Sequence, residues 1–197
     1  ELLERACVLA DHGLRRERIR GLLQAADPAV VVDSALLNEV NNLVEWPVVV
    51  ACTLEEEFLH VPHAALVASM QDHQKFFPVR DPADPRRVSH RFLAIANIDS
   101  RDLTAVREGY ERVIRPRLAD ARFFLEQDQK QPLEQYLEGL DRVVFQQKIG
   151  TVGDKTRRIA AISKKLAEIL SIDPDTAARA AQLAKCDLLT QMVGEFP

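Results

Sequence analysis

Apolar residues recur at helical spacing near the start of the chain. Residues 1–26 are helical in pattern, and arginines occupy the polar face of the predicted helix. Its apolar positions are Leu14, Ile19, Leu22 and Leu23. Asp27-Pro28 breaks this pattern. Asp33-Ser34 can cap a second helix, which ends at Trp46-Pro47. The spacing predicts one buried stripe on it, formed by Leu36, Leu37, Val40, Leu43 and Val44.

Three short segments have the pattern of β-strands. Val48–Thr53 is a continuous apolar run rich in β-branched residues, which is typical of a buried strand. Lys75–Val79 and Arg91–Ala96 are also predicted strands, and residues 81–85 between them are dense in turn formers. We therefore expect a β-hairpin with a long loop. A helix that opens at Pro62 precedes it and places three apolar side chains on one face. These are Leu66, Val67 and Met70.

Most of the remaining chain is predicted to be helical. A long helix follows Asp99-Ser100 and runs to about Lys130. Its apolar stripe consists of Ile114, Leu118, Ala121 and Leu125. Pro116 should kink or interrupt this helix, because proline has no N–H to donate to residue 112. From Asp154 onward the pattern is again helical. The stripe expected there consists of Ile159, Ile162, Leu166 and Leu170.

These elements predict the α+β class. An N-terminal α+β region with a small antiparallel sheet and helices is followed by an all-helical region. We place the boundary so that residues 1–140 form the first domain and residues 141–197 the second. The sequence contains no internal repeat and no low-complexity segment.

Composition narrows the classes of function. The 197 residues are 47% apolar and carry a formal charge of −4, so any contact with nucleic acid has to depend on local cationic patches. The three cysteines are too scattered for a disulfide framework or a CxxC metal site, and they favour a reducing, cytoplasmic setting. We expect neither a membrane span nor a signal peptide. The chain opens with Glu1 rather than Met, and we expect it to be a piece of a longer protein.

Three histidines near residues 60–73 are the only candidates for a metal site. Pro62 lies between His60 and His63 and prevents a regular helical HxxH arrangement, so a metal role is disfavoured. His73 falls on the apolar side of the preceding helix if that helix continues. We expect His73 to be a partly buried structural histidine.

Lys75 and two aromatic residues follow these histidines. Phe76 and Phe77 alternate in a predicted strand, so one ring is expected in the core and the other toward a neighbouring element or solvent. Packing is the favoured role of both rings, and an outward ring beside Lys75 is a weak indication of RNA binding. Lys75 is a candidate phosphate contact.

Residues 150–156, GTVGDKT, superficially resemble a phosphate-binding loop. That loop needs four residues between its glycines, whereas here only two separate them, and Asp154 places a negative charge where the anion would bind. We predict instead that Asp154 caps a helix whose first turns carry Lys155, Arg157 and Arg158. A solvated surface is the favoured interpretation of this basic patch, and contact with RNA is the alternative.

A second cationic strip consists of Arg112, Arg115 and Arg122. At 100° per residue these side chains flank the apolar stripe of the long helix, so they can reach solvent or a partner. Acidic residues close in sequence can pair with them. Those residues are Glu108, Glu111 and Asp120. Intramolecular pairing and phosphate contact are both left open.

Six blocks carry a resemblance that periodicity does not supply. They are LLNEVNNLVEWPVVV (36–50), FLHVPHAALVASMQDHQKFFPV (58–79), FLAIANIDSRD (92–102), GYERVIRPRLADARFF (109–124), VVFQQKIGTVGDKTRRI (143–159) and LAKCDLLTQMVGEFP (183–197). In order and spacing they resemble the beta subunit of bacterial glycyl-tRNA synthetase, over about residues 34–197. One departure is Tyr110, which stands where the family pattern has asparagine.

The resemblance implies a section of a glycine–tRNA ligase, internal to the beta subunit. In that family two alpha and two beta subunits form a heterotetramer that joins glycine to its tRNA with ATP and magnesium. The alpha subunit would hold the active site with ATP and Mg²⁺, so this fragment would bind neither. The first part would resemble the phenylalanyl-tRNA synthetase beta subunit, and the helical end would open a degenerate HD-type domain.

The expected partners are the alpha subunit, tRNA(Gly) and a second beta subunit, without a membrane. We predict that the fragment binds tRNA and assists assembly but is not catalytic alone. The candidate tRNA-binding residues are Lys75, Arg112, Arg115, Arg122, Lys155, Arg157 and Arg158. No catalytic or metal-binding residue is predicted.

Two other functions stay open. An HD-type metal-dependent phosphohydrolase needs a His-Asp pair and further histidines. All five histidines lie at or before His90, and Asp187 has no histidine beside it. The third hypothesis is a purely structural connector that does not contact RNA.

Overall fold

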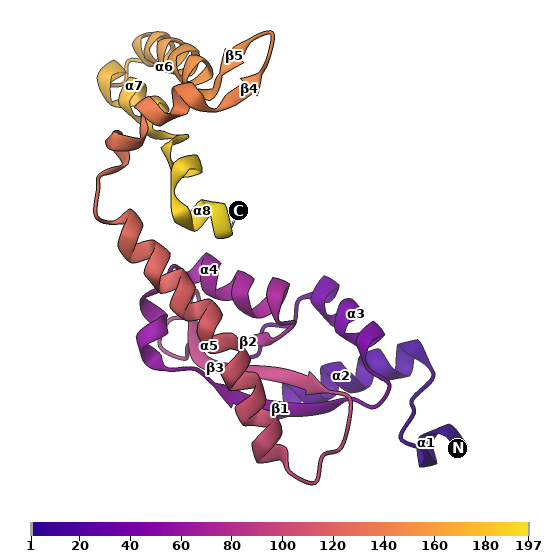
Figure 1. Ribbon diagram of the computed structural model, residues 1–197. Helices are drawn as coiled ribbons and strands as arrows, with labels where there is room; N and C mark the ends of the chain where they lie inside the picture. Colours follow the sequence, from indigo (N-terminus) through magenta and orange to yellow (C-terminus); the bar gives the residue numbers. More distant parts are fainter. Residues whose placement is uncertain (1, 197) are drawn as a thin grey trace. The chain divides into compact units, whose positions relative to one another are not determined.

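A computed structural model describes residues 2–196 of the chain (Figure 1). Its contacts divide the chain into two compact units, of which the first ends at Arg122 and the second begins at Phe123. We describe each unit by itself. The predicted division into a domain of residues 1–140 and a domain of residues 141–197 stays a prediction.

The first unit combines a small sheet with several helices, which confirms the predicted α+β class. Its elements are α1 (Leu2–Arg5), α2 (His12–Ala26), α3 (Ser34–Leu43), β1 (Val48–Thr53), the 3₁₀-helix η1 (Glu56–His60), α4 (His63–Ala68), the π-helical turn η2 (Ser69–His73), β2 (Phe77–Arg80), β3 (Val88–Ala96) and most of α5 (Leu103–Asp128). The predicted strand over Val48–Thr53 and the predicted hairpin of β2 and β3 are confirmed.

The sheet has the order β1-β3-β2, and both pairings are antiparallel. Val48 lies opposite Ala96, and Phe77 lies opposite Leu93. Helices α2 and α3 pack on one face of this sheet through buried side chains of Ile19, Leu23, Leu36, Leu37, Val40 and Leu93, among others. The predicted stripe of α3 is therefore confirmed in its first two turns.

Two expectations at the start of the chain are wrong. Residues 1–26 do not form one helix, because Cys7 adopts a left-handed φ of 58° that an α-helix does not contain. A new helix then begins where the Asp11 carboxylate accepts a hydrogen bond from the N–H of Leu14 at 2.8 Å. Leu14, in the first turn of α2, and Leu43, at the end of α3, are both exposed, so neither belongs to the buried face of its helix.

The opposite face of the sheet packs against α5. Ile114, Leu118 and Ala121 of the predicted stripe are buried, whereas Leu125 is only partly so. Pro116 lies inside α5 without interrupting it. Helices tolerate proline when the remaining hydrogen bonds and the packing of the apolar face outweigh the one missing bond.

The second unit is not all-helical. Besides the end of α5 it contains η3 (Leu133–Tyr136), η4 (Glu138–Arg142), β4 (Val144–Gln146), β5 (Gly150–Thr151), α6 (Val152–Ile169), α7 (Pro174–Leu183), η5 (Cys186–Leu189) and α8 (Gln191–Glu195). Strands β4 and β5 form a two-stranded antiparallel hairpin, which corrects the all-helical expectation. The chain can turn there because Gly150 takes a φ of 97°, which other residues rarely adopt.

The apolar stripe expected on α6 is also wrong in this chain. Ile162, Leu166 and Leu170 are 60%, 52% and 66% exposed, and Ile159 is only partly buried. Apart from Val152 at its start, the buried positions of α6 are small residues instead, namely Gly153, Thr156, Ala160 and Ala167. Small side chains let α6 approach its neighbours closely, and α7 lies alongside it with Ala181 buried. Periodicity alone selects the large residues and so assigns the wrong face.

Candidate nucleic-acid interface

The seven cationic residues predicted to contact RNA fall into two sets. Lys75, Arg112, Arg115 and Arg122 belong to the first unit, and Lys155, Arg157 and Arg158 belong to the second. We describe the sets separately, starting from the local structure that positions each side chain.

Lys75 lies at the junction between η2 and β2 with a left-handed φ of 60°. Its ammonium Nζ is 2.8 Å from the Glu39 carboxylate of α3. Phe76 and Phe77 are both buried, which confirms packing as their role, and neither ring points to solvent beside Lys75. Phe77 joins the core against α2 and α3, while Phe76 stacks on Phe92 on the α5 side. Because helices cover both faces of the sheet, neither ring can stack on a base.

The histidines lie on the surface. His60, His63 and His73 are all exposed, which corrects the expectation of a partly buried His73. The segment Ser69–His73 is a π-helical turn, so the 100° step that placed His73 on the apolar side does not apply. Within residues 2–196 no three His, Cys, Asp or Glu side chains are grouped so that they can hold a metal ion.

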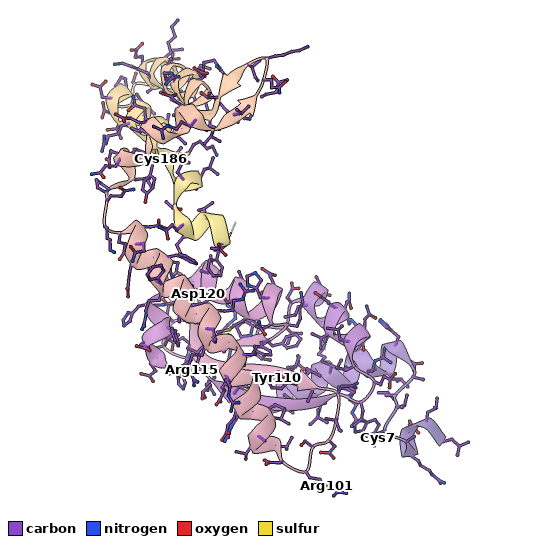
Figure 2. The ribbon with its side chains drawn as sticks, viewed as in Figure 1. Cys7, Arg101, Tyr110, Arg115, Asp120 and Cys186 are labelled. Carbon is purple, nitrogen blue, oxygen red and sulfur yellow. The ribbon has the colours of Figure 1, made fainter. Side chains whose placement is uncertain are left out.

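Two arginines of α5 bind glutamates of the segment after β1. Nε of Arg115 donates to Glu55, and Nη1 of Arg122 donates to Glu57 at 2.7 Å. The Arg122 guanidinium also lies 5.5 Å from the centre of the Phe58 ring. The acids close in sequence that we expected as partners are not the ones used. Figure 2 labels Arg115 on α5.

Arg112 differs from its two neighbours on α5. Its side chain is exposed, and among the described residues it makes no hydrogen bond or ion pair. Arg117 is also exposed and, among the described residues, makes no hydrogen bond or ion pair, but the predicted set does not include it. The spacing of Arg117 from the stripe could have indicated it, because it flanks Ile114 and Leu118 on the side opposite Arg115.

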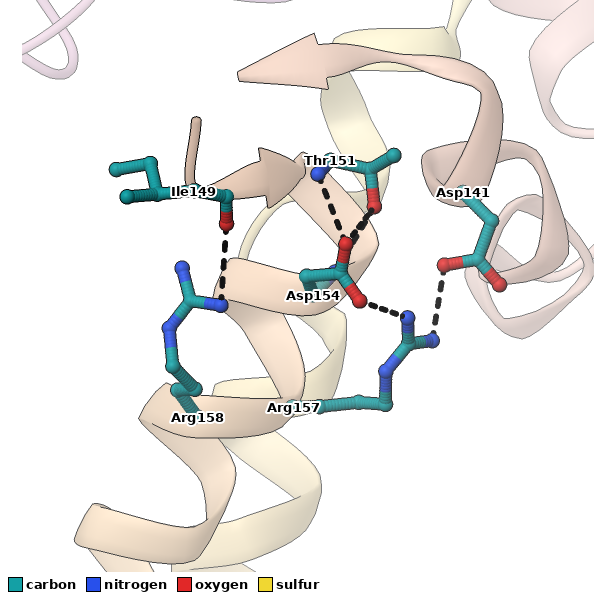
Figure 3. A network of polar contacts seen from close by, with 6 residues as sticks. All are labelled: Asp141, Ile149, Thr151, Asp154, Arg157 and Arg158. Carbon is teal, nitrogen blue, oxygen red and sulfur yellow. Dashed lines mark hydrogen bonds and ion pairs between the residues drawn. The ribbon is translucent and has the colours of Figure 1, made fainter. Parts of the chain in front are cut away.

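The second set lies in the first two turns of α6, where Figure 3 shows Arg157 and Arg158. Nη1 of Arg157 donates to Asp141 at 2.8 Å, and Nη2 donates to Asp154 at 2.7 Å. Nζ of Lys155 lies 4.0 Å from the centre of the Phe145 ring. Arg158 is exposed, and its one bond is a long one of 3.4 Å to the carbonyl of Ile149.

Thr151, not Asp154, is the N-cap of α6, which corrects our expectation. Oγ1 of Thr151 accepts from the N–H of Asp154 at 3.0 Å, and the Asp154 carboxylate accepts from the N–H of Thr151 at 2.9 Å. This reciprocal arrangement is a capping box, in which the acid occupies the third helical position. The Asp154 carboxylate thus offsets the cations that follow it near the positive end of the helix dipole.

The capping box predicts a pH dependence of stability. The hydrogen bond from the Thr151 backbone, followed by those from Arg157 and the Thr151 hydroxyl, lowers the pKa of Asp154 from 3.8 to about 2. A lowered carboxyl pKa stabilises the fold above the unfolded value, and this contribution is lost as pH falls through about 2. We expect Asp154→Asn to reduce the pH dependence between these two values, while the lowered pKa of Asp173 keeps part of it. Acid titration of helix content by circular dichroism checks this, with Asp187→Asn as the control expected to keep it.

The pairing decides which cations are available to a phosphate. Exposed ion pairs contribute only about 0–1 kcal/mol, so a phosphate can displace the carboxylates of Arg115, Arg122 and Arg157. Arg112 and Arg158 need no such exchange, because neither binds a carboxylate among the described residues.

No helix in the described part of the chain is long and apolar enough to cross a membrane.

Comparison with known proteins finds one family. The family model described as "Glycyl-tRNA synthetase beta subunit" matches residues 1–197. Proteins named glycine–tRNA ligase beta subunit from Pseudomonas putida (strain GB-1) and Chromohalobacter salexigens are 47% and 49% identical over 201 residues. The corresponding protein of Pseudoalteromonas translucida is 46% identical over 200 residues. Each comparison covers 100% of this chain and 29% of the relative, so the chain spans less than a third of the length of these relatives.

Proposed function

This chain belongs to the family of glycyl-tRNA synthetase beta subunits, and from that premise we propose that it is a tRNA-binding and assembly section of a glycine–tRNA ligase. The section does not activate glycine and is not catalytic alone. Its partners are the alpha subunit, tRNA(Gly) and a second beta subunit in a heterotetramer. ATP and Mg²⁺ act at the alpha subunit, and the assembly works in the cytoplasm.

The observation that supports an RNA contact is that Arg112 is exposed and unpaired among the described residues. It projects from a long helix into solvent with no carboxylate partner among the described residues, although acidic residues are abundant nearby. Arg158 offers a second guanidinium of this kind in the other unit. Guanidinium groups bind phosphate oxygens through two parallel hydrogen bonds, so each can contact one phosphate of the tRNA backbone.

We predict that Arg112→Glu combined with Arg158→Glu weakens tRNA binding by the complete enzyme, uniformly across tRNA sequences. The slope of log affinity against log salt should become shallower by about 0.7–0.9 for each phosphate that the variant no longer neutralises. Filter binding or fluorescence anisotropy over a series of salt concentrations measures both quantities.

Arg5→Glu is the control, because Arg5 is exposed in the short helix α1 and, among the described residues, makes no ion pair. Each Arg→Glu replacement changes the charge equally, so a general field effect scales with the number replaced. A slope unchanged in the double variant, or a proportional change in the control, contradicts a direct bond from these arginines to phosphate.

A structural connector is the second candidate, and the bonds of Arg115 and Arg122 to Glu55 and Glu57 favour it. These ion pairs hold α5 against the segment after β1. This is a structural role that does not require RNA. If the double variant binds tRNA normally and the enzyme still assembles, the connector is the better description.

A further inference from the structure

The sheet of the first unit has one covered and one uncovered edge. Residues 29–31 cover the outer side of β2, where the N–H of Val31 donates to Pro78 at 2.8 Å and the N–H of Arg80 donates to Ala29 at 3.0 Å. Within residues 2–196 no segment pairs with the outer side of β1. β1 is therefore the free edge, which places unpaired backbone groups at the surface.

The free backbone groups belong to Val49 and Ala51. The N–H of Thr53 points away from β3, because it donates to Oε1 of Glu111 at 2.9 Å. Backbone direction alternates along a strand, so Val49 and Ala51 share this outward orientation. The Glu111 side chain thus accepts a hydrogen bond from one outward N–H of this edge, that of Thr53. The outward N–H groups of Val49 and Ala51 have no partner among the described residues.

Two cavities adjoin along this edge, with volumes of about 370 Å³ and 150 Å³. Both are lined by Ala51 of β1 and Arg107 of α5. The larger extends to Thr53 and the smaller to Val49, so together they form a groove along the strand, with the first turns of α5 as one wall. The larger also reaches β3 and the end of α2, where Arg91 and Asp27 form an ion pair at 2.6 Å. We call this the β1 groove.

Arg107 occupies a position in the β1 groove where the helix pattern calls for an apolar residue. It lies two turns before Ile114, on the same face of α5, yet it is exposed and forms no ion pair with any described residue. Burial raises the pKa of the Cys52 thiol to about 12, while the charge of Glu111 adds to this rise and that of Arg107 opposes it. Both charges therefore lie close to the strand.

We propose that in full-length members of this family an extended segment of the same polypeptide adds to β1 as a fourth strand and places one carboxylate beside Arg107. Val49 and Ala51 supply the backbone hydrogen bonds. The added strand stops before Thr53, because Glu111 already occupies the acceptor position there. Glu108 also lines the groove and repels a second acid, so the segment carries a single acidic side chain at this place.

The length of the relatives favours an occupant from the same polypeptide. The matched region is 29% of those proteins, so most of their chain lies outside it. A tethered segment competes at an effective concentration in the millimolar range, which a separate protein rarely reaches. An edge left open along two such cavities would also favour aggregation through strand pairing.

Hydrogen exchange of the backbone amides tests this proposal. We expect the amides of Val49 and Ala51 to exchange roughly 100-fold more slowly in a full-length beta subunit carrying this sequence than in the 197-residue chain. The experiment needs neither tRNA nor the alpha subunit, so its outcome is independent of the proposed function. Equal exchange in both proteins overturns the proposal, as does protection that appears only after the alpha subunit is added.

Ala51→Pro provides the second measurement. Proline removes the outward N–H but spares the ladder to β3, and edge strands tolerate it, so the 197-residue chain should keep its thermal midpoint. In the full-length subunit the variant should return the Val49 amide to the fast exchange of the short chain. Ala51→Val keeps the N–H and should keep the protection. If Ala51→Pro leaves Val49 protected in the full-length subunit, no strand is paired there.

Arg107→Gln tests the carboxylate. Loss of the cation should raise the exchange rate at Ala51 in the full-length subunit by up to about fivefold, as expected for one cross-strand charge pair. In the 197-residue chain exchange should not change, because Arg107 has no ion pair there among the described residues. An unchanged rate in the full-length subunit removes the acidic side chain from the proposal.

Discussion

Replacing Phe92 with alanine is expected to lower the free energy of unfolding of the first unit by about 3–5 kcal/mol. Phe92 is 0% exposed, and its ring stacks on Phe76 with the ring centres 4.9 Å apart. Tyr110 of α5 meets Phe76 edge to face at 5.4 Å. Truncation removes one ring of this three-ring cluster. The cavity cannot close easily, because the ladders to β1 and β2 hold the backbone of β3 in place.

The single tryptophan, Trp46, reports on this unit, so urea unfolding followed by its fluorescence measures the loss. Leu43→Ala is the control in the same unit. Leu43 is 62% exposed, and its truncation should cost less than about 1 kcal/mol. Equal losses in the two variants would mean that the three-ring cluster does not stabilise the sheet against α5.

Replacing Gly153 with valine is expected to destabilise the second unit by about 1–3 kcal/mol through overpacking. A Cβ at Gly153 would meet the carboxylate oxygen Oδ1 of Asp141 and lie only 2.9 Å from its Cγ and 3.1 Å from its backbone nitrogen. The side chain of Asp141 can turn away, but the backbone of η4 cannot. Moving it would also break the bond of Asp141 to Arg157. The gain in helix propensity over glycine is a few tenths of a kcal/mol and does not compensate.

Circular dichroism during urea unfolding follows the helices of both units, and Trp46 fluorescence follows the first unit alone. A shift in circular dichroism with unchanged Trp46 fluorescence therefore belongs to the second unit. The matched control is Gly194→Val in α8, where an added Cβ meets nothing within 4 Å. We expect the control to change the unfolding free energy by less than about 0.5 kcal/mol. A control as damaging as Gly153→Val would show that helix propensity, rather than the contact with η4, determines the result.

Local pattern was sufficient for most of the first unit. The β-branched run Val48–Thr53 and the turn-rich residues 81–85 each determine their conformation within a few residues, so the strand and the hairpin could be predicted. The helix expected over residues 1–26 failed because α1 ends in a local C-cap. There the N–H of Cys7 donates to Glu4 at 3.0 Å and the N–H of Val8 donates to Leu3 at 2.8 Å, around a left-handed Cys7. No glycine or asparagine stands there to mark such a cap in the sequence.

The candidate interface shows the same division. Sequence spacing placed Arg112, Arg115 and Arg122 beside the apolar stripe of α5, but it could not identify their partners. Glu55 and Glu57 lie 60 and 65 residues before the arginines they bind. Only the fold brings them together, and within residues 2–196 it provides no carboxylate for Arg112. Glu111, one of the acids expected as a partner, instead accepts hydrogen bonds from the backbone N–H and the hydroxyl of Thr53.

By itself the sequence determined the α+β class, the family, the strands of the first unit and the capped start of α3, because ordered motifs, residue type and nearest neighbours are sufficient for each. The tertiary structure decided which face of α6 is buried, which arginines are paired and which edge of the sheet stays open. These depend on atoms that are distant along the chain, and on whether small residues allow two elements to approach, neither of which periodicity records.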